Sequence, residues 1–167
     1  MDKLIDRINN NEALFFSKKA GSFSGIPQRT VQRWTEGGLI SPAEDTAGGT
    51  GNRRKYNILN CIQIAITKAL TDGRVRISTV SDIMERLNGY GGERLPFLLG
   101  FDEAFLVIHL SSTAPDKPYS ILYDYFNHED RAEHMKIMST LVFNPDIEKT
   151  LIINVTKISE TIIDSID

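Results

Sequence analysis

The chain of 167 residues contains a single cysteine, Cys61. One cysteine excludes a disulfide within the chain and excludes a metal site built from several cysteines. The sequence also lacks any run of about eighteen apolar residues, which argues against a membrane-spanning helix. Its first residues, MDKLIDRINNNEAL, mix both signs of charge and lack the apolar core of a secretion signal. We therefore expect a protein of the reducing cytoplasm with no membrane partner.

Signatures of catalysis and nucleotide binding are missing as well. No nucleophile is paired with a base in any familiar spacing, and the glycine-rich stretch at Gly48–Gly51 lacks the lysine and serine that follow in a phosphate-binding loop. These absences predict that the protein is not an enzyme and carries no cofactor.

A short acidic and histidine-containing stretch at 128–134 is the sharpest rival signal. Asp130 and His134 are four residues apart, as are Glu129 and Glu133, so each pair would share one face of a helix. His128 falls on a different face from His134. His109 is a candidate third ligand. Strong metal sites usually show three ligands, so we interpret the stretch as a solvated helix face and hold a metal-dependent enzyme as the less favoured alternative.

The formal net charge of −3 is unevenly distributed along the chain. Residues 1–94 contain 14 Lys and Arg against 10 Asp and Glu, whereas residues 95–167 contain 5 against 12. Such asymmetry is expected when one part of a protein faces a polyanion and the other does not.

The positive part centres on residues 24–56, which open with a turn at Gly25 and Pro27. The spacing of Ile26, Val31 and Trp34 predicts an amphipathic helix over about 27–36 with these residues inward. Gly37-Gly38 would end the helix where a positive φ is needed. The opposite face would carry four polar residues, Gln28, Arg29, Gln32 and Arg33.

A second basic feature follows the helix. After a segment rich in glycine, threonine and acidic residues come four consecutive candidates for contact with phosphates, Arg53, Arg54, Lys55 and Tyr56. A polar helix of this kind fits the major groove of a DNA duplex, and a basic hairpin over 48–56 would reach phosphates beside it. The alternative interpretation of the cationic run is a solvated hairpin tip.

Further helices are predicted on both sides of this stretch. A short first helix would begin at Leu14-Phe15-Phe16 with Ser17 as its N-cap, and 1–13 would be a frayed lead-in. Asn57 would cap a helix that ends at Asp72-Gly73, with Cys61 buried in it. Ser78 would cap another, with Val80, Ile83, Met84 and Leu87 on one stripe. The glycine-rich stretch Asn88–Gly92 is the clearest break in the pattern, and we place a domain boundary there.

The remainder predicts a small α+β domain. Apolar residues 104–110 and aromatic residues 119–126 suit two strands of a hairpin, followed by a helix from His128 to about Leu141 that is capped by Asn127. Residues 145–166 fit either one long amphipathic helix or a strand at 150–157 followed by a helix capped by Ser159. We favour the strand because the segment is dense in β-branched residues.

Residues 14–87 resemble the DNA-binding domain of the MerR family of bacterial transcription regulators, a winged helix-turn-helix. The residues that carry the resemblance are Gly25, Thr30-Val31, Trp34, Gly38-Leu39-Ile40, Pro42, Gly49, Arg54-Lys55-Tyr56, the helix from Asn57 to Leu70, Gly73, Ser78 and Ile83. The resemblance implies that Gln28, Arg29, Gln32 and Arg33 lie on the recognition helix and that Arg54 and Tyr56 belong to the wing. Departures from the family pattern are Pro27, Gln32, Arg33 and Thr35, which stand where a serine, an arginine, an aromatic residue and a glutamate are usual.

The resemblance and the residue pattern together predict an α+β protein with an N-terminal all-α winged helix-turn-helix domain at 14–89, a linker at 90–100 and a small C-terminal α+β domain at 101–167. The expected function is sequence-specific binding of double-stranded DNA as a homodimer. Members of the family usually dimerise through a long helix after this domain, so dimerisation is expected to use 101–167 here. The alternative is that 101–167 senses a small-molecule effector or docks a partner such as RNA polymerase, with DNA binding as its output.

Overall fold

A computed structural model of the chain describes residues 4–9, 12–45, 54–92, 94–110, 119–142 and 149–166. Helices and strands within these ranges confirm the predicted α+β class. The helices are α1 (Leu4–Asn9), α2 (Ser17–Ser22), α3 (Gln28–Glu36), α4 (Ile58–Asp72), α5 (Ile77–Gly92), α6 (Arg94–Leu98), α7 (Arg131–Val142) and α8 (Val155–Asp164), with a 3-10 turn η1 at His128–Asp130. The strands are β1 (Phe15–Phe16), β2 (Lys55–Tyr56), β3 (Glu103–Leu110), β4 (Tyr119–Phe126) and β5 (Lys149–Asn154).

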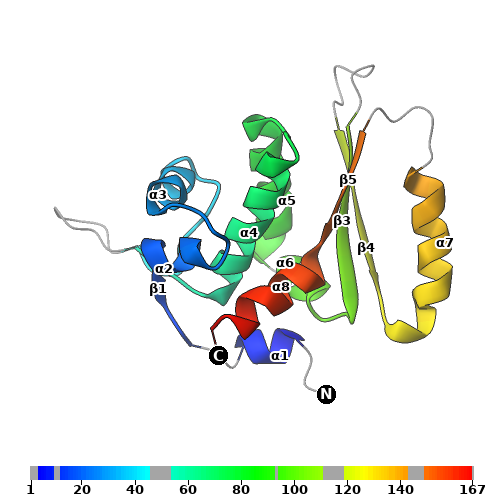
Figure 1. Ribbon diagram of the computed structural model, residues 1–167, viewed down its shortest axis with the longest axis horizontal. Coiled ribbons are helices and arrows are strands. Elements are labelled where there is room, and N and C mark those ends of the chain that lie inside the picture. The colour runs from blue at the N-terminus through cyan, green and yellow to red at the C-terminus, as the bar shows by residue number, and fades with distance from the viewer. Residues whose placement is uncertain are drawn as a thin grey trace.

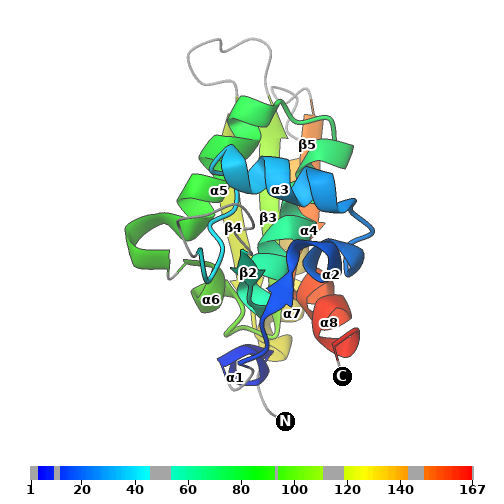
Figure 2. The ribbon, with the colours of Figure 1, turned by 90° about the vertical axis from the view of Figure 1, so that its left-hand side faces the viewer.

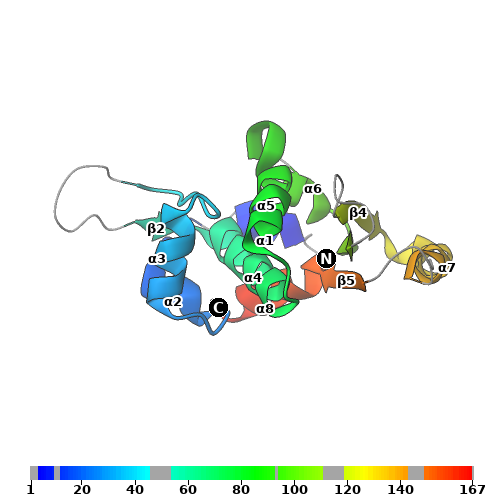
Figure 3. The same cartoon turned by 90° about the horizontal axis from the view of Figure 1, so that it is seen from above.

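These elements form successive layers along the long axis of the molecule. Helices α2 and α3 lie at one end, α4 and α5 occupy the middle, and the sheet of β3, β4 and β5 follows, with α7 beyond it (Figure 1). Seen from the end that carries α3, this helix lies across the front of the molecule (Figure 2). The view from above shows the same order of layers (Figure 3). Helix α3 therefore lies at the opposite end of the molecule from α7.

The turn between α2 and α3 depends on two glycines. Gly25 has a φ of +66°, in the left-handed region that glycine adopts without steric cost. A Cβ at Gly21 would lie 2.5 Å from the carbonyl oxygen of Ile26, so the chain passes close to α2 at this point. Val31 and Trp34 are buried on the inner side of α3, as their spacing predicts. Gly38 ends the helix with a φ of +76°, which also agrees with the prediction.

The start of α2 differs from the sequence prediction. Phe15 and Phe16 form β1 rather than the first turn of a helix, and they pair antiparallel with Tyr56 and Lys55 of β2. The backbone groups of these two phenylalanines are used in strand pairing, so the helix begins only at Ser17. A two-stranded pairing thus accompanies the helices of a region that was predicted to be all-α.

Helix α4 begins as predicted. The side chain of Asn57 accepts a hydrogen bond from the backbone N–H of Asn60, and the side chain of Asn60 accepts one from the N–H of Asn57. This reciprocal arrangement satisfies two donors at the helix start. Helix α5 begins two residues earlier than predicted, because the N–H of Val80 donates to the carbonyl of Arg76 and Ser78 is already inside the first turn.

The predicted boundary and linker are helical. Asn88–Gly92 forms the last part of α5, and α6 follows within the segment 90–100. Leu87 before the glycines and Leu95 after them are buried, so packing holds this stretch helical against the local preference of glycine. The lead-in at 1–13 also contains a helix, α1, whose Ile8 is buried.

One continuous cluster of buried residues joins the two halves of the chain. It runs from Ile8 in α1 through Val31 and Ile62 to Leu106 in β3 and Ile163 in α8. Helix α8 packs against α4 and β3, and α1 packs against α8. The parts at 14–89 and 101–167 therefore share a core.

The larger sheet is antiparallel in the order β4-β3-β5, which includes the predicted hairpin of 104–110 with 119–126. Leu106 pairs with Tyr123 on one side and Ile153 on the other, and all three contribute to the shared core. On the other face, the ring of His134 in α7 stacks on Phe126, with 4.8 Å between centroids.

The last segment is a strand followed by a helix, which decides between the two alternatives for 145–166. Strand β5 ends at Asn154, and α8 starts at Val155. The cap is Asn154, whose side chain accepts from the N–H of Lys157, rather than Ser159. Ser159 lies inside the helix and donates to the carbonyl of Val155. The side chains of Met135, Met138 and Leu141 in α7 lie outside the described part of the structure.

Candidate nucleic-acid interface

Helix α3 presents a polar outer face. Gln28, Arg29 and Arg33 are exposed, and Gln32 is half-buried beside them. Arg29 and Arg33, four residues apart, share the face opposite Val31, with Gln32 at its edge and Gln28 at the start of the helix. In the described part of the chain, neither Arg29 nor Arg33 has an ion-pair partner. Their guanidinium groups are thus free to donate to an external acceptor.

The chain after α3 returns to pair with itself. The N–H of Glu44 donates to the carbonyl of Lys55 at 3.1 Å, and the N–H of Lys55 donates to the carbonyl of Glu44 at 2.9 Å. This antiparallel bridge adjoins the pairing of β1 with β2. Residues 46–53 lie beyond the bridge and outside the described residues, and with them the predicted contact Arg53.

Acidic neighbours hold the two described cations of this segment. Arg54 lies 3.4 Å from the carboxylate of Asp45 and 3.7 Å from that of Glu36 at the end of α3. The Nζ atom of Lys55 lies 2.6 Å from the carboxylate of Glu44. Two of the predicted phosphate contacts, Arg54 and Lys55, thus have carboxylate partners, and these ion pairs were not predicted from the sequence. The adjacent pair Glu44-Asp45, before the glycines, was the signal for them.

Tyr56 does not fit the role of a direct phosphate contact. Its side chain is fully buried, and its hydroxyl lies 2.9 Å from Oγ1 of Thr35 in α3. Oγ1 of Thr35 also lies 3.0 Å from the carbonyl of Val31, to which it donates. Because strand pairing turns the Tyr56 ring into the core, the residue joins β2 to α3 instead of facing solvent.

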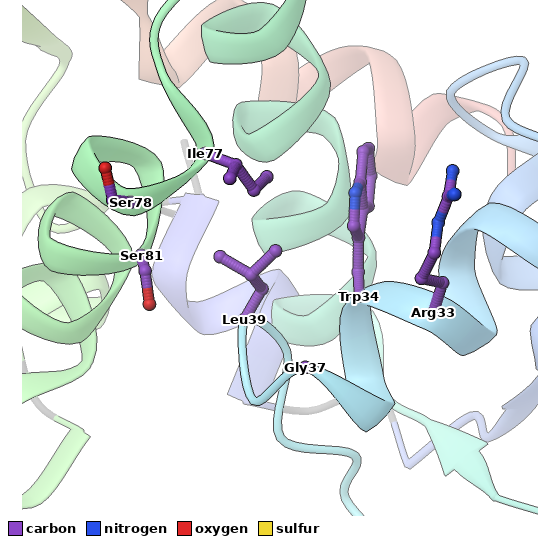
Figure 4. A pocket seen from close by; sticks show the side chains of 7 residues that line it. All are labelled: Arg33, Trp34, Gly37, Leu39, Ile77, Ser78 and Ser81. Atoms are coloured by element: carbon purple, nitrogen blue, oxygen red, sulfur yellow. The ribbon is translucent and has the colours of Figure 1, made fainter.

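A cavity of about 580 Å³ opens between α3 and α5 (Figure 4). Its lining residues are Arg33, Trp34, Gly37, Leu39, Ile77, Ser78 and Ser81. Trp34 is 8 % exposed, in agreement with its predicted place in the core, and its remaining surface borders the cavity. Ile77 on the opposite wall is 57 % exposed, which is unusual for a large apolar side chain. The cavity shares Arg33 with the outer face of α3.

The residues weighed as metal ligands do not gather. Nδ1 of His134 lies 2.9 Å from the carboxylate of Asp124, while Nδ1 of His109 lies 3.0 Å from Oγ1 of Thr150 on another strand. Burial lowers the pKa of His109. Within the ranges that the structure describes, no three side chains of His, Cys, Asp or Glu are grouped to hold a metal ion, and the side chain of His128 is outside these ranges.

Cys61 is buried in α4, where it was predicted to act as a small apolar residue. Burial raises the pKa of its thiol to about 12, so the thiol stays protonated and poorly reactive at neutral pH. None of the described helices is both long and apolar enough to cross a membrane.

The family model described as MerR HTH family regulatory protein matches residues 17–87, which run from the start of α2 into α5. Residues 17–87 are therefore similar to a MerR-type helix-turn-helix domain. This finding confirms the resemblance seen in the sequence. The MerR-type domain is that of DNA-binding regulators, so it indicates DNA as a partner. Residues 88–167 lie outside the match, and no curated protein matches the chain.

Proposed function

We propose that the protein is a sequence-specific transcription regulator whose helix α3 enters the major groove of DNA. The outer face of α3 within the MerR-type domain carries this proposal, because it offers two guanidinium groups without carboxylate partners in the described structure. Arg29 and Arg33 would donate to base edges or nearby phosphates. Gln28 and Gln32 would approach the same groove. An arginine that binds a guanine with two hydrogen bonds is the commonest specific contact of this kind.

The segment 48–56 would act as a wing that binds phosphates beside the groove. Arg53, Arg54 and Lys55 supply its positive charge. The pairing of Arg54 with Asp45 and Glu36 means that a phosphate must compete with carboxylates for this side chain. Surface ion pairs contribute only about 0–1 kcal/mol each, so this competition weakens phosphate binding without preventing it. Tyr56 would support the wing from inside the core.

The regulator would bind as a homodimer, because one such domain covers too little duplex for useful specificity. Exposed apolar side chains in the C-terminal part support dimerisation there. Leu122 and Ile152 both pair with Val107, one on each side, so they lie in one row across the sheet. Analytical ultracentrifugation of the full chain tests this surface. Leu122→Lys with Ile152→Lys should shift the dimer to monomer, and an unchanged dimer would place the interface elsewhere.

Fluorescence-anisotropy titration tests DNA binding directly. The probe is the duplex upstream of the protein's own gene, at about 50 and 200 mM salt with scrambled competitor, since release of counterions makes phosphate contacts strongly salt-dependent. Tight binding that resists competitor and weakens steeply with salt is expected. The absence of binding at the lower salt concentration would contradict the proposal for this operator, and a pool of random duplexes then tests for any other.

A second candidate function is that residues 101–167 form a sensor or docking module with DNA binding as its output. Two contacts between the halves favour coupling of this kind. Helix α8 packs on α4, and the hydroxyl of Tyr119 in β4 donates to the carboxylate of Asp82 in α5 at 3.2 Å. Within the aromatic strand β4, Tyr125 packs its ring against Phe97 and Phe101.

The sensor hypothesis is best tested on the full chain, because the core is shared. Thermal-shift screening should include the wild type and Tyr119→Phe, which removes only the hydroxyl bonded to Asp82. The informative result is a compound that stabilises both proteins against heat. If it changes the DNA affinity of Tyr119→Phe less than that of the wild type, coupling runs through this contact. An equal change in both proteins would argue against that route.

We propose a cytoplasmic location and leave RNA polymerase as the partner to be tested for the acidic C-terminal part.

A further inference from the structure

The cavity between α3 and α5 has the size and walls of a small-molecule site. Its volume of about 580 Å³ falls within the range of roughly 300–1,000 Å³ that ligand sites occupy. Trp34, Leu39 and Ile77 supply apolar surface from three separate segments. In Figure 4 these side chains border one gap, with Ser78 and Ser81 on its α5 side. An apolar body of modest size would therefore find contacts on several sides.

Trp34 brings an unused hydrogen-bond donor to this gap. Most of the side chain is buried, but its indole nitrogen is not among the buried polar atoms that lack a partner, so this N–H keeps contact with solvent. The nitrogen lies on the edge of the ring that faces Leu39 and Ile77 (Figure 4). A ligand in the cavity could replace solvent as the acceptor of this N–H.

The charge of the lining favours a negatively charged ligand. Arg33 is the only charged residue among those that line the cavity, and it has no ion-pair partner within the described ranges. The cavity also borders the start of α5. The N–H groups of Ile77, Ser78 and Thr79 precede the first intrahelical bond, which runs from Val80 to Arg76. A helix start with unpaired N–H groups favours an anion, and it borders the cavity that Trp34 and Arg33 line from the α3 side.

We propose that this cavity binds a small amphipathic carboxylate, such as an aromatic or branched aliphatic acid. The apolar part would lie between Trp34, Leu39 and Ile77, and the carboxylate would accept hydrogen bonds from the indole N–H and the guanidinium of Arg33. A DNA phosphate is also an anion, but it has no apolar part to contact Trp34, Leu39 and Ile77.

Ligand binding would oppose DNA binding, because both need the same guanidinium group. This consequence rests on the proposed function, whereas binding of the carboxylate itself does not. An acid in the cavity would withdraw Arg33 from the groove. The protein would then release its operator when the acid accumulates.

Trp34 is the only tryptophan of the chain, so its fluorescence and its indole N–H signal in NMR both report on the cavity without interference. The test titrates the full-length protein, without DNA, with phenylacetate and with its neutral analogue phenylacetamide. Phenylacetate should shift the indole N–H signal with a Kd of about 0.1–1 mM, as expected for so small a ligand. Phenylacetamide should bind about tenfold more weakly, because it lacks the charge that Arg33 pairs with.

Two matched variants separate a specific site from general attraction of anions. Arg33→Met should weaken phenylacetate binding to the level of phenylacetamide, whereas Arg29→Met, on the same helix but outside the lining, should leave it unchanged. Ser81→Leu should fill the cavity and abolish binding of both compounds while thermal unfolding shows a folded protein. The proposal is overturned if the indole signal does not move at about 10 mM phenylacetate, well above the expected Kd, or if both arginine variants behave alike.

A last arm distinguishes a carboxylate from a phosphodiester. If a short duplex moves the indole signal and phenylacetate does not, the cavity is a DNA contact and the proposal is wrong. If the protein binds the labelled operator duplex, phenylacetate should lower the anisotropy of that duplex. Unchanged anisotropy would show that DNA and the acid do not compete for Arg33. Should DNA binding fail altogether, the titration without DNA still decides whether the carboxylate site exists.

Discussion

The two cationic parts of the MerR-type domain differ in what their charges face. On α3, Arg29 and Arg33 have no carboxylate partner in the described structure. In the segment after α3, Arg54 and Lys55 are paired with Glu36, Asp45 and Glu44. The sequence suggested that the segment was the more basic feature, with three cations in succession. Among the cations that the structure describes, those of α3 are the more available, because availability depends on neighbours and not on the local count.

The largest effect is expected from the arginines of α3. Arg33→Ala and Arg29→Ala should each weaken operator binding by about tenfold to a hundredfold, since a lost bidentate base contact costs about 1–3 kcal/mol. Anisotropy titrations at one salt concentration measure this change. Lys157→Ala, an exposed cation on α8, is the control and should bind like the wild type. If the α3 variants also bind like the wild type, α3 is not the recognition helix.

Tyr56→Phe should affect stability and leave DNA affinity unchanged. The substitution removes a hydroxyl that is bonded to Thr35, and the loss of such a bond costs about 1 kcal/mol. Urea unfolding of Tyr56→Phe, Thr35→Val and the double variant forms a cycle in which the double variant should lose less than the sum of the single ones. If the slope of log K for DNA binding against log salt is smaller in Tyr56→Phe than in the wild type, Tyr56 contacts a phosphate after all.

Arg54→Ala should weaken DNA binding less than Arg33→Ala. The carboxylates of Asp45 and Glu36 already neutralise much of its charge, so fewer counterions are released when it meets a phosphate. The slope of log K against log salt should fall by less than about 1, the change expected for one full phosphate contact. A fall of a full unit or more would mean that the ion pairs break completely on DNA.

The smallest effect is expected from the acidic partners, and it has the opposite sign. Glu36→Gln and Asp45→Asn should strengthen DNA binding a few-fold at low salt, because each releases Arg54 from a surface ion pair worth about 0–1 kcal/mol. The gain should shrink as salt rises. Glu129→Gln, at the far end of the molecule, is the control. Weaker binding in the two variants would show that the carboxylates orient Arg54 for DNA instead of competing with it.

Local signals predicted the parts of the interface that depend on local chemistry. The spacing of Ile26, Val31 and Trp34 defined α3, and Gly38 defined its end. The polar side chains at 57 and 60 cap their own helix, so Asn57 could be recognised as a helix start. These features need only neighbouring residues, and the structure confirms them.

Contacts between distant residues could not be predicted in the same way. The helicity of Asn88–Gly92 depends on burial of Leu87 and Leu95 against other elements, which overrides the preference of glycine. The pairing of Arg54 with Glu36 joins a strand end to a helix end. The cavity exists because Trp34 of α3 lies near Ile77 of α5, and nothing in either sequence stretch indicates that proximity.

The continuous buried cluster determines how genetic results on this protein should be interpreted. Substitution of Leu106 or Ile153 by alanine would leave a void in the same core that supports Val31 behind α3. A screen for loss of regulation would therefore recover sheet variants that touch neither DNA nor ligand. Immunoblots of protein abundance distinguish the classes, because core variants should be depleted by cellular proteases while variants of the α3 surface accumulate normally.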